Sequence, residues 1–308
     1  MSEPDLRRWP VGQVGMVALV GRPNVGKSTL LNHWLNYHLA AVSPTPQTTR
    51  RACRGILSDA AGQVIFVDTP GAHEGDKLLN RCMLEAVDQA LDDADVLICL
   101  ADPTRLPGVE DDLIATRVGA AAADKAVFLV LNKSDLATPE QRQATVAAYR
   151  RRLGAVPPEH AISALTGAGL PELLAAVRAK LPRGPFLYDP DQVTDAFERD
   201  VGAELIREAA MALLRDELPH CLAVEVEKWD ESGPKLRVGA KLHVERDSQK
   251  AIVIGHGGTM IHDVRVSAER SLHQVFERPV KLELHVKVSP DWRNQRGFLK
   301  HLGLAGQA

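Results

Sequence analysis

The chain has 308 residues, of which 45% are hydrophobic and 25% charged, and its formal net charge is −3 at pH 7. This length suits about two domains of ordinary size, and the composition excludes a disordered chain. The charge excludes a protein that is cationic over its whole surface, so a polyanion would have to meet a local basic patch.

The cysteine pattern and the apolar runs bear on the compartment. The chain begins MSEPDLRRWPVGQ, which lacks the apolar core of a signal peptide, and no run approaches the roughly 20 apolar residues of a membrane span. The four cysteines show neither CxxC spacing nor a neighbouring histidine at zinc spacing. They are Cys53, Cys82, Cys99 and Cys221. We therefore expect a protein of the reducing cytoplasm.

Short apolar runs alternate with longer helical patterns from Val17 to about Leu181. The runs are VALV, VIFVDTPG, VLICLAD, VFLVLNKSD and HAISAL. Continuous apolar strands indicate burial on both faces, and interleaved helices indicate a mostly parallel sheet. The pattern predicts an α/β doubly wound domain. One helix start is explicit in TPEQ, where Thr138 is the predicted cap, Pro139 the first helical residue and Gln141 the partner of a capping box.

The pattern changes at LPRGPFLYDPDQVTD, where proline and glycine interrupt the chain. Beyond it we expect a helix, two strands, two helices around IGHGG and a last strand, VKLELHVKV. This order describes a small α+β domain. The predicted boundaries are an N-terminal extension 1–14, an α/β domain 15–182, a linker 183–195 and a second domain with a C-terminal tail, 196–308.

The stretch GRPNVGKST after the first apolar run matches G-x-x-x-x-G-K-[ST]. Such a turn leaves backbone N–H groups free to surround phosphate oxygens at a helix N-terminus. Lys27 adds a charge for the outer phosphates, and the Ser28 hydroxyl is a ligand for Mg²⁺. An ordinary glycine-rich turn is disfavoured because a predicted strand precedes the motif and a predicted helix follows it. The predicted nucleotide-binding residues here are Gly21, Arg22, Pro23, Asn24, Val25, Gly26, Lys27, Ser28 and Thr29.

Further nucleotide-binding signals follow in chain order. VIFVDTPG ends a predicted buried strand with Asp68, placed to hold Mg²⁺, and Gly71 offers a backbone N–H to the terminal phosphate. The neighbouring Thr69 and Pro70 complete this predicted contact. Upstream, PTPQTTR offers Thr48 and Thr49 as alternative hydroxyl ligands for the metal.

The base is predicted to be recognised by NKSD and SAL. The Asp135 carboxylate accepts from both N1–H and the 2-amino group of guanine, whereas adenine offers neither donor. The loop after the last strand brings a backbone N–H to the guanine O6. The predicted residues are Asn132, Lys133, Asp135, Ser163, Ala164 and Leu165.

These motifs, together with QTTR, the linker RGPFLYDPDQVTD and the stretch QKAIVIGHGGTMI, resemble the Era branch of the translation-factor-like GTPases over nearly the whole chain. The resemblance implies a P-loop NTPase domain followed by a type II KH domain, and GTP hydrolysis to GDP with Mg²⁺. It also implies contact with the 3′ end of 16S rRNA, assistance in assembly of the 30S ribosomal subunit, a monomer, and peripheral association with the inner membrane in some members.

In a KH module a G-x-x-G loop between two helices clamps about four nucleotides, because glycine allows close approach of the RNA backbone. The loop interior here is His256 and Gly257, where a KH loop usually offers lysine or arginine. The predicted RNA contacts are Gly255, His256, Gly257, Gly258, Lys241, Lys250, Ile254, Ile261, Arg265 and Arg293, with Ile252 and Val253 as further groove residues and Arg296 and Lys300 as further cations.

The predicted catalytic residues are Lys27, Thr49 and Gly71, because phosphoryl transfer depends on positioning and charge neutralisation. In Ras-like proteins a glutamine follows the glycine of DxxG, but this chain has Ala72 there. We therefore expect slow intrinsic turnover. Asn24 resembles the asparagine that ligates K⁺ in related GTPases.

Three hypotheses follow for the function of the whole chain. The first is a GTP-controlled RNA-binding switch. The second is a GTPase whose C-terminal domain docks on a protein or a membrane rather than on RNA. The third, a metabolic P-loop kinase, is disfavoured because the guanine-recognising motifs serve no acceptor substrate.

Overall fold

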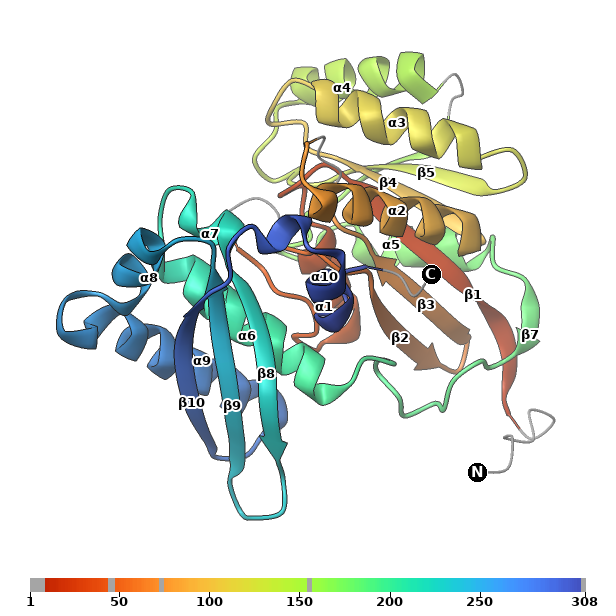
Figure 1. The fold of residues 1–308 in the computed structure, drawn as a ribbon. Coiled ribbons are helices and arrows are strands. Elements are labelled where there is room, and N and C mark those ends of the chain that lie inside the picture. The colour runs from red at the N-terminus through yellow and green to blue at the C-terminus, as the bar shows by residue number, and fades with distance from the viewer. Residues whose placement is uncertain (1–8, 44–47, 72–74, 154–156, 306–308) are drawn as a thin grey trace. The chain divides into compact units, whose positions relative to one another are not determined.

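The computed structural model describes residues 9–43, 48–71, 75–153 and 157–305 (Figure 1). Contacts between Cα atoms divide the chain into two compact units. The first comprises Met1–Leu39, Thr49–Glu74 and Met83–Asp195, and the second comprises Ala40–Thr48, Gly75–Cys82 and Ala196–Ala308. Among the described residues, every helix is too short or too polar to span a bilayer.

The first unit is built on a seven-stranded sheet in the order β2-β3-β1-β4-β5-β6, with β7 paired to β1. Its strands are β1 Val11–Gly21, β2 Cys53–Asp59, β3 Gly62–Asp68, β4 Val96–Ala101, β5 Ala126–Leu131, β6 Glu159–Ala161 and β7 Arg183–Pro185. β3, β1, β4, β5 and β6 run parallel, whereas β2 and β7 are antiparallel to their partners. The predicted α/β sheet is confirmed. The two antiparallel strands were not among the predicted ones.

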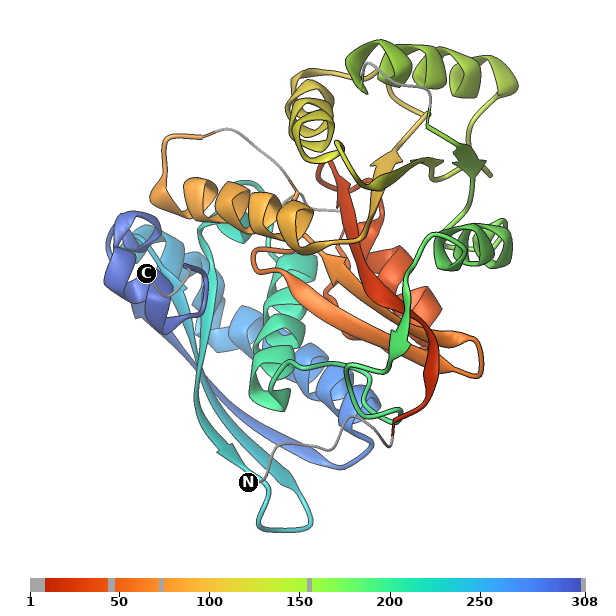
Figure 2. The ribbon, with the colours of Figure 1, turned by 90° about the vertical axis from the view of Figure 1, so that its right-hand side faces the viewer.

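Burial explains why the central strands form here. Every residue of β3 and every residue of β4 is buried, as expected for strands covered on both faces. Helices α2 Leu78–Asp93, α3 Val109–Ala121 and α4 Pro139–Leu153 contribute Val87, Ile114 and Tyr149 to one core, against alternate residues of the sheet. Figure 2 shows α2 on one side of the sheet and α1 on the other.

The opposite face is covered by α1 Lys27–Leu35 and α5 Leu170–Arg178. Trp34 of α1 stacks on Phe66 of β3, with ring centroids 4.4 Å apart and an interplanar angle of 17°. This contact ties the helix that follows the glycine-rich loop to the middle of the sheet. The loop therefore joins two rigid elements.

The predicted capping box of α4 is present. The Thr138 backbone N–H donates to Gln141 Oε1 at 2.8 Å, and the Gln141 N–H donates to Thr138 Oγ1 at 3.3 Å. The two side chains satisfy donors that the first turn of a helix leaves unpaired. They fix where α4 begins.

The segment 183–195, which we predicted as a linker, begins with β7 and stays attached to the first unit. Gln63 Oε1 accepts hydrogen bonds from the backbone N–H groups of Leu187 and Tyr188 at 2.8 and 2.9 Å. Gln63 Nε2 also donates to the Tyr188 carbonyl at 2.9 Å. The buried amide of Gln63 thus replaces strand pairing beyond β7.

The second unit contains the predicted α-β-β-α-α-β order. Its elements are α6 Glu198–Leu213, α7 Leu218–Cys221, β8 Ala223–Asp230, β9 Leu236–Val244, α8 Asp247–Ile254, the 3₁₀ turn His256–Gly258, α9 Thr259–Phe276, β10 Val280–Val288, the 3₁₀ turn Trp292–Asn294 and α10 Arg296–His301. The sheet order is β10-β9-β8, with β10 parallel and β8 antiparallel to β9. The predicted small α+β domain is confirmed.

Candidate nucleotide-binding site

The loop after β1 adopts a conformation that its sequence requires. Gly26 has φ 101° and Asn24 has φ 59°, in the left-handed region that glycine and asparagine tolerate best. A Cβ atom on Gly26 would lie 2.2 Å from Asn132 Nδ2. Both the backbone angle and the close approach of Asn132 therefore require glycine at position 26.

Lys27 is buried at the start of α1. Its Nζ donates to the carbonyl oxygens of Gly21 at 2.9 Å and of Arg22 at 3.1 Å. Burial lowers the pKa of Lys27 to about 8, although the negative charges of Asp68 and Glu110 oppose this shift. The ammonium group lies within the loop, where a polyphosphate would pair with it.

Ser28, Thr49 and Asp68 come together from three separate segments. Asp68 Oδ2 accepts hydrogen bonds from Ser28 Oγ at 2.7 Å and from Thr49 Oγ1 at 3.1 Å, and the two hydroxyl oxygens are 2.9 Å apart. Of the two threonines that the sequence offered, Thr49 is the one whose hydroxyl reaches this cluster.

The same cluster has the donor chemistry of a magnesium site. Asp68 is fully buried, and its Oδ1 has no hydrogen-bond partner in the described part of the chain. Burial raises the pKa of Asp68, while Lys27 and the two hydroxyl groups oppose the shift. A buried carboxylate oxygen without a partner beside two hydroxyls fits a hard cation, which prefers oxygen ligands.

The DTPG segment packs directly on the phosphate loop. Thr69 Oγ1 donates to the Leu19 carbonyl of β1 at 2.7 Å. A Cβ atom on Gly71 would lie 2.8 Å from Pro23 Cα, so only glycine allows this approach. Pro70 is also buried. Ala72, the position where Ras-like proteins carry glutamine, lies outside the described residues.

Asn132 holds two loops of the predicted guanine site. Its Nδ2 donates to the Val25 carbonyl at 2.7 Å, and its Oδ1 accepts from the Ala164 backbone N–H at 2.9 Å. Ser163 is buried, whereas Leu165 and Asp135 are exposed. The carboxylate predicted to recognise guanine therefore lies at the surface, beside a framework that Asn132 fixes.

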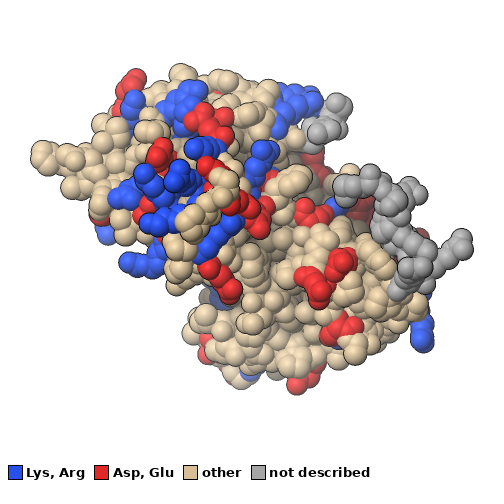
Figure 3. All heavy atoms as spheres, turned by 90° about the horizontal axis from the view of Figure 1, so that it is seen from below, with Lys and Arg blue, Asp and Glu red and all other residues tan. Residues whose placement is uncertain are grey.

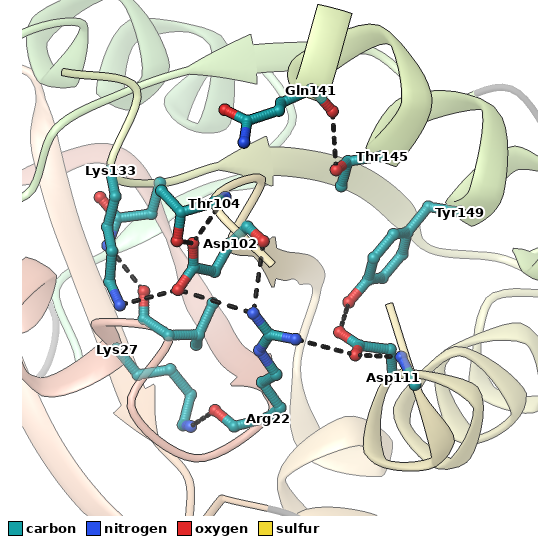
Figure 4. Close-up of polar contacts among 12 residues, drawn as sticks. Arg22, Lys27, Asp102, Thr104, Asp111, Lys133, Gln141, Thr145 and Tyr149 are labelled. Atoms are coloured by element: carbon teal, nitrogen blue, oxygen red, sulfur yellow. Dashed lines mark hydrogen bonds and ion pairs between the residues drawn. The ribbon is translucent and has the colours of Figure 1, made fainter. Parts of the chain in front are cut away.

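Arg22, one of the predicted nucleotide-binding residues, has a buried side chain that bonds to other residues of the chain. It is 3% exposed, and its guanidinium donates to Asp111 Oδ2 at 3.2 Å and to the Asp102 carbonyl at 3.3 Å (Figure 4). Lys133 of NKSD donates to Asp102 Oδ2 at 2.8 Å. No role was predicted for Asp102, Asp111 or Tyr149. The position of Asp102 could have been noticed in the sequence, because this residue follows a buried apolar strand, just as Asp68 ends one.

The glycine-rich loop of the second unit has the backbone that its sequence predicts. Gly255, Gly257 and Gly258 all have positive φ, at 75°, 59° and 82°. Ile254 and Ile261 are half-buried and Ile252 is 55% exposed. Val253 is fully buried, so the prediction that it lines a groove is wrong. The helical period of α8 places Val253 on the same buried face as Gln249, four residues earlier.

Three of the predicted RNA-contacting cations are paired with carboxylates. Arg293 contacts Glu245 through two nitrogens, at 2.6 and 3.0 Å, and Arg265 contacts both oxygens of Glu269. Lys241 is paired with Glu227. Lys250 has no carboxylate partner among the residues that the structure describes. His256 lies in the loop itself, within the 3₁₀ turn.

Two family models match the chain in the regions described above. The model described as "50S ribosome-binding GTPase" matches residues 16–133, and the model described as "KH domain" matches residues 217–293. The first covers the glycine-rich loop through Lys133, and the second covers the loop Gly255–Gly258.

Curated relatives match over nearly the whole chain. GTPase Era of Nitratidesulfovibrio vulgaris is 39% identical over 95% of this chain and 97% of its own length. GTPase Era of Geobacter metallireducens is 40% identical over 94% of this chain and 97% of its own length.

Two solved structures of Era share the fold. A single-residue variant of Aquifex aeolicus Era bound to GDP·AlF₄⁻ has a TM-score of 0.90 and 34% identity, covering 96% of this chain and 100% of that chain. A structure of Era with MgGDPNP and nucleotides 1506–1542 of 16S ribosomal RNA has the same TM-score, identity and coverage. The chain therefore belongs to the family of GTPase Era, which confirms the resemblance carried by its motifs.

Proposed function

We propose that this GTPase is a switch that binds the 3′ end of 16S rRNA through its KH domain and assists assembly of the small ribosomal subunit. The relative solved with MgGDPNP and nucleotides 1506–1542 of 16S rRNA supports both ligands. The observation that carries the proposal is the junction of Ser28, Thr49 and Asp68, because it links the metal site to a segment outside the phosphate loop.

The nucleotide roles follow from the geometry of the first unit. The backbone of the loop 21–29 and Lys27 bind the phosphates, Asp135 recognises guanine, and the Gly71 N–H contacts the terminal phosphate. Ser28, Thr49 and Asp68 would hold Mg²⁺, which supplies charge neutralisation to the phosphates when bound. Asn132 keeps the phosphate loop and the Ala164 loop in one arrangement.

We further propose that Asn24 ligates K⁺ near the phosphates. Its support is the resemblance of the motif together with the position of Asn24 in the phosphate loop, where it is half-buried and has a left-handed backbone with φ 59°. Such a cation would supply positive charge that the residue at position 72, alanine, does not. Comparing hydrolysis rates in K⁺ and Na⁺ at equal ionic strength tests this role, and equal rates would contradict it.

RNA binding would depend on a local surface rather than on the charge of the whole chain. Lys and Arg gather over part of one face of the molecule, with Asp and Glu between them (Figure 3). The proposed RNA contacts are the glycine loop Gly255–Gly258, the apolar residues Ile254 and Ile261, and Lys250.

The switch is tested with an oligonucleotide of the 16S 3′ end and protein loaded with a GTP analogue, with GDP, or with no nucleotide. We expect affinities that differ between these states, because a metal ion held with the nucleotide would bind Thr49 and order the segment around it. Identical affinities in the three states would contradict the switch and leave nucleotide binding untouched.

A second candidate function is docking of the KH domain on a protein or a membrane. The ion pairs of Lys241, Arg265 and Arg293 favour it, because paired cations are less available to phosphate. The salt dependence of RNA binding separates the two functions, since phosphate contacts give a steep slope of affinity against salt. The monomeric state, the cytoplasmic location and the peripheral membrane association stay predictions, to be checked by sedimentation and cell fractionation.

A further inference from the structure

The carboxylate of Asp102 lies between the phosphate loop, residues 21–29, and the NKSD loop, residues 132–135, which is called the guanine loop below. Lys133, from the loop after β5, donates to Asp102 Oδ2 at 2.8 Å, and the Arg22 guanidinium of the phosphate loop lies 3.6 Å from the same oxygen. Arg22 also donates to the Asp102 carbonyl at 3.3 Å. β4 lies between β1 and β5 in the sheet, so the residue that follows it reaches both loops (Figure 4).

The surroundings of this carboxylate are fixed rather than mobile. The Thr104 backbone N–H donates to Asp102 Oδ1 at 3.0 Å, which leaves Oδ2 for the two cations. Asp102 is 4% exposed. Against burial, which would raise it, the hydrogen bonds from Lys133 and Thr104 hold the pKa of Asp102 below its usual value. The carboxylate is therefore charged and oriented.

A second carboxylate holds Arg22 from the other side. Asp111 of α3 is 2% exposed, and its Oδ2 accepts from Arg22 at 3.2 Å and from the Gly108 N–H at 2.9 Å. The Tyr149 hydroxyl donates to Asp111 Oδ1. Two cations thus face two buried carboxylates, and every carboxylate oxygen has a donor. Such a satisfied network favours one geometry, because loss of Arg22 would leave the buried carboxylate of Asp111 without a counter-ion.

We propose that Asp102 is a positioning residue that sets the distance between the phosphate loop and the guanine loop, through Arg22 and Lys133, so that binding of the base and binding of the phosphates reinforce each other. A nucleotide that binds both loops gains the full coupling between base and phosphate binding. A nucleotide that lacks the 2-amino group or the β-phosphate makes fewer contacts with one loop and gains less of this coupling. The inference rests on the nucleotide site proposed above.

The predicted metal ligands lie outside this network, although Lys27 Nζ donates to the main-chain carbonyl of Arg22. The described hydrogen bonds of Asp102, Asp111 and Arg22 include none to Ser28, Thr49 or Asp68. Loss of the Asp102 charge should therefore raise KM for GTP more than it lowers kcat. A general distortion of the loop would lower both.

The test uses Asp102→Asn in the full-length protein and displacement of a fluorescent GDP by GDP, IDP, GMP and IMP. In the unmodified protein, we expect the preference for guanine over hypoxanthine to be larger between the diphosphates than between the monophosphates. In the variant, GDP affinity should fall about tenfold and the two preferences should become equal, as in a double-mutant cycle whose coupling is lost.

Asp112→Asn is the matched control, because it makes the same chemical change at an aspartate outside the network. Asp112 follows Asp111 in α3, is 56% exposed and pairs with Arg152. Tyr149→Phe is the second variant if Asp102→Asn does not fold. It removes only the hydroxyl that holds Asp111, so a fall in GDP affinity of about threefold, with a smaller preference among the diphosphates, is expected for a weakened hydrogen bond.

Unchanged GDP affinity, or an equal loss for all four nucleotides, would overturn the role of Asp102. If only Tyr149→Phe folds, unchanged GDP affinity or an equal loss for all four nucleotides in that variant would overturn the role of Asp102. If the unmodified protein fails to prefer GDP to IDP, the nucleotide site itself is wrong. The two failures are therefore distinguishable.

Discussion

The side-chain amide of Asn132 donates a hydrogen bond to the main-chain carbonyl of Val25, with a distance of 2.7 Å, and so joins the end of β5 to the loop after β1. Its Oδ1 accepts from the Ala164 N–H at 2.9 Å. One buried side chain therefore fixes both the phosphate loop and the loop predicted to face the guanine O6. The motif NKSD therefore has a structural role besides its proposed role in base recognition.

Asn132→Asp tests whether the Asn132 side chain holds the Val25 and Ala164 loops together, with little change in side-chain shape. A carboxylate can still accept from Ala164 but cannot donate to the Val25 carbonyl, and it places a charge in a buried site. Loss of the donor should cost about 1–3 kcal/mol, roughly a 5-fold to 150-fold loss of GDP affinity. Titration calorimetry measures it, with Gln143→Glu on the exposed face of α4 as control. Affinity equal to that of the control would contradict this role of Asn132.

The motifs and their order along the chain predicted the first unit and most of its site, because each motif follows a buried strand. The carboxyl ends of parallel strands meet at one edge, so Asp68 and Asn132 were expected to lie near the loop of Lys27. The sequence did not predict that Asp102 lies between the two loops, because that placement depends on the order of β1, β4 and β5 in the sheet.

The contacts that were not predicted join residues from separate elements of the chain. Arg22 was predicted only as a member of its motif. Its ion pair with Asp111 of α3, and the hydrogen bond from Tyr149 of α4 to Asp111, follow from no local pattern in the loop. The short strand β7 pairs through only three residues, too few to show a periodicity. Helical phase, in contrast, would have placed Val253 in the core beforehand.

Asp135→Asn should change the base preference without unfolding the protein. Asp135 is exposed. An amide cannot accept from both donors of guanine, so GTP affinity should fall roughly 10²–10⁴-fold, while xanthine nucleotides gain a donor for their O2. Competition between GTP and XTP, together with a thermal melt, checks this. A variant that binds GTP as tightly as the unmodified protein would remove Asp135 from the base site.

Nucleotide binding should take up a proton at alkaline pH. Burial lowers the pKa of Lys27 to about 8, and a bound polyphosphate would restore its charge. Proton uptake per GDP bound should therefore be larger at pH 8.5 than at pH 7 and should not exceed one proton from this group. Calorimetry in buffers of different ionisation enthalpy measures this uptake.

The sign of the associated pH dependence follows from the same pKa. Below about pH 8 Lys27 is charged in both free and bound protein, so this group gives GDP affinity no pH dependence. Above that pH the affinity should fall by up to tenfold per pH unit until the lysine is neutral in both states. Proton release on binding at pH 8.5 would contradict this account.

Asp68→Asn should separate metal binding from nucleotide binding. Chelation of Mg²⁺ by EDTA should weaken GTP binding in the unmodified protein but change it little in the variant, and hydrolysis should be lost. Because burial raises the pKa of Asp68, Mg²⁺ has to displace a proton as the pH falls, so its affinity should decrease toward acid pH. Asp124→Asn, in an exposed turn, is the control. Undiminished Mg²⁺ dependence in Asp68→Asn would place the metal elsewhere.

The two cations of the KH helices should differ in their effect on RNA binding. Lys250 of α8 has no carboxylate partner in the described part of the chain, whereas Arg265 of α9 contacts both oxygens of Glu269 at 3.0 and 3.1 Å. A cation that already has a counter-ion releases little when a phosphate approaches, because the carboxylate competes for it. Lys250 is therefore expected to be the stronger phosphate contact.

Lys250→Ala should weaken binding of an oligonucleotide of the 16S 3′ end and reduce the slope of log affinity against log salt by about 0.7, the value for one contact to a single strand. Arg265→Ala should leave the slope unchanged. Fluorescence anisotropy at several salt concentrations measures both. A reduced slope for Arg265→Ala alone would show that the ion pair with Glu269 opens on RNA, and an unchanged slope for both variants would move the phosphate contacts away from these two helices.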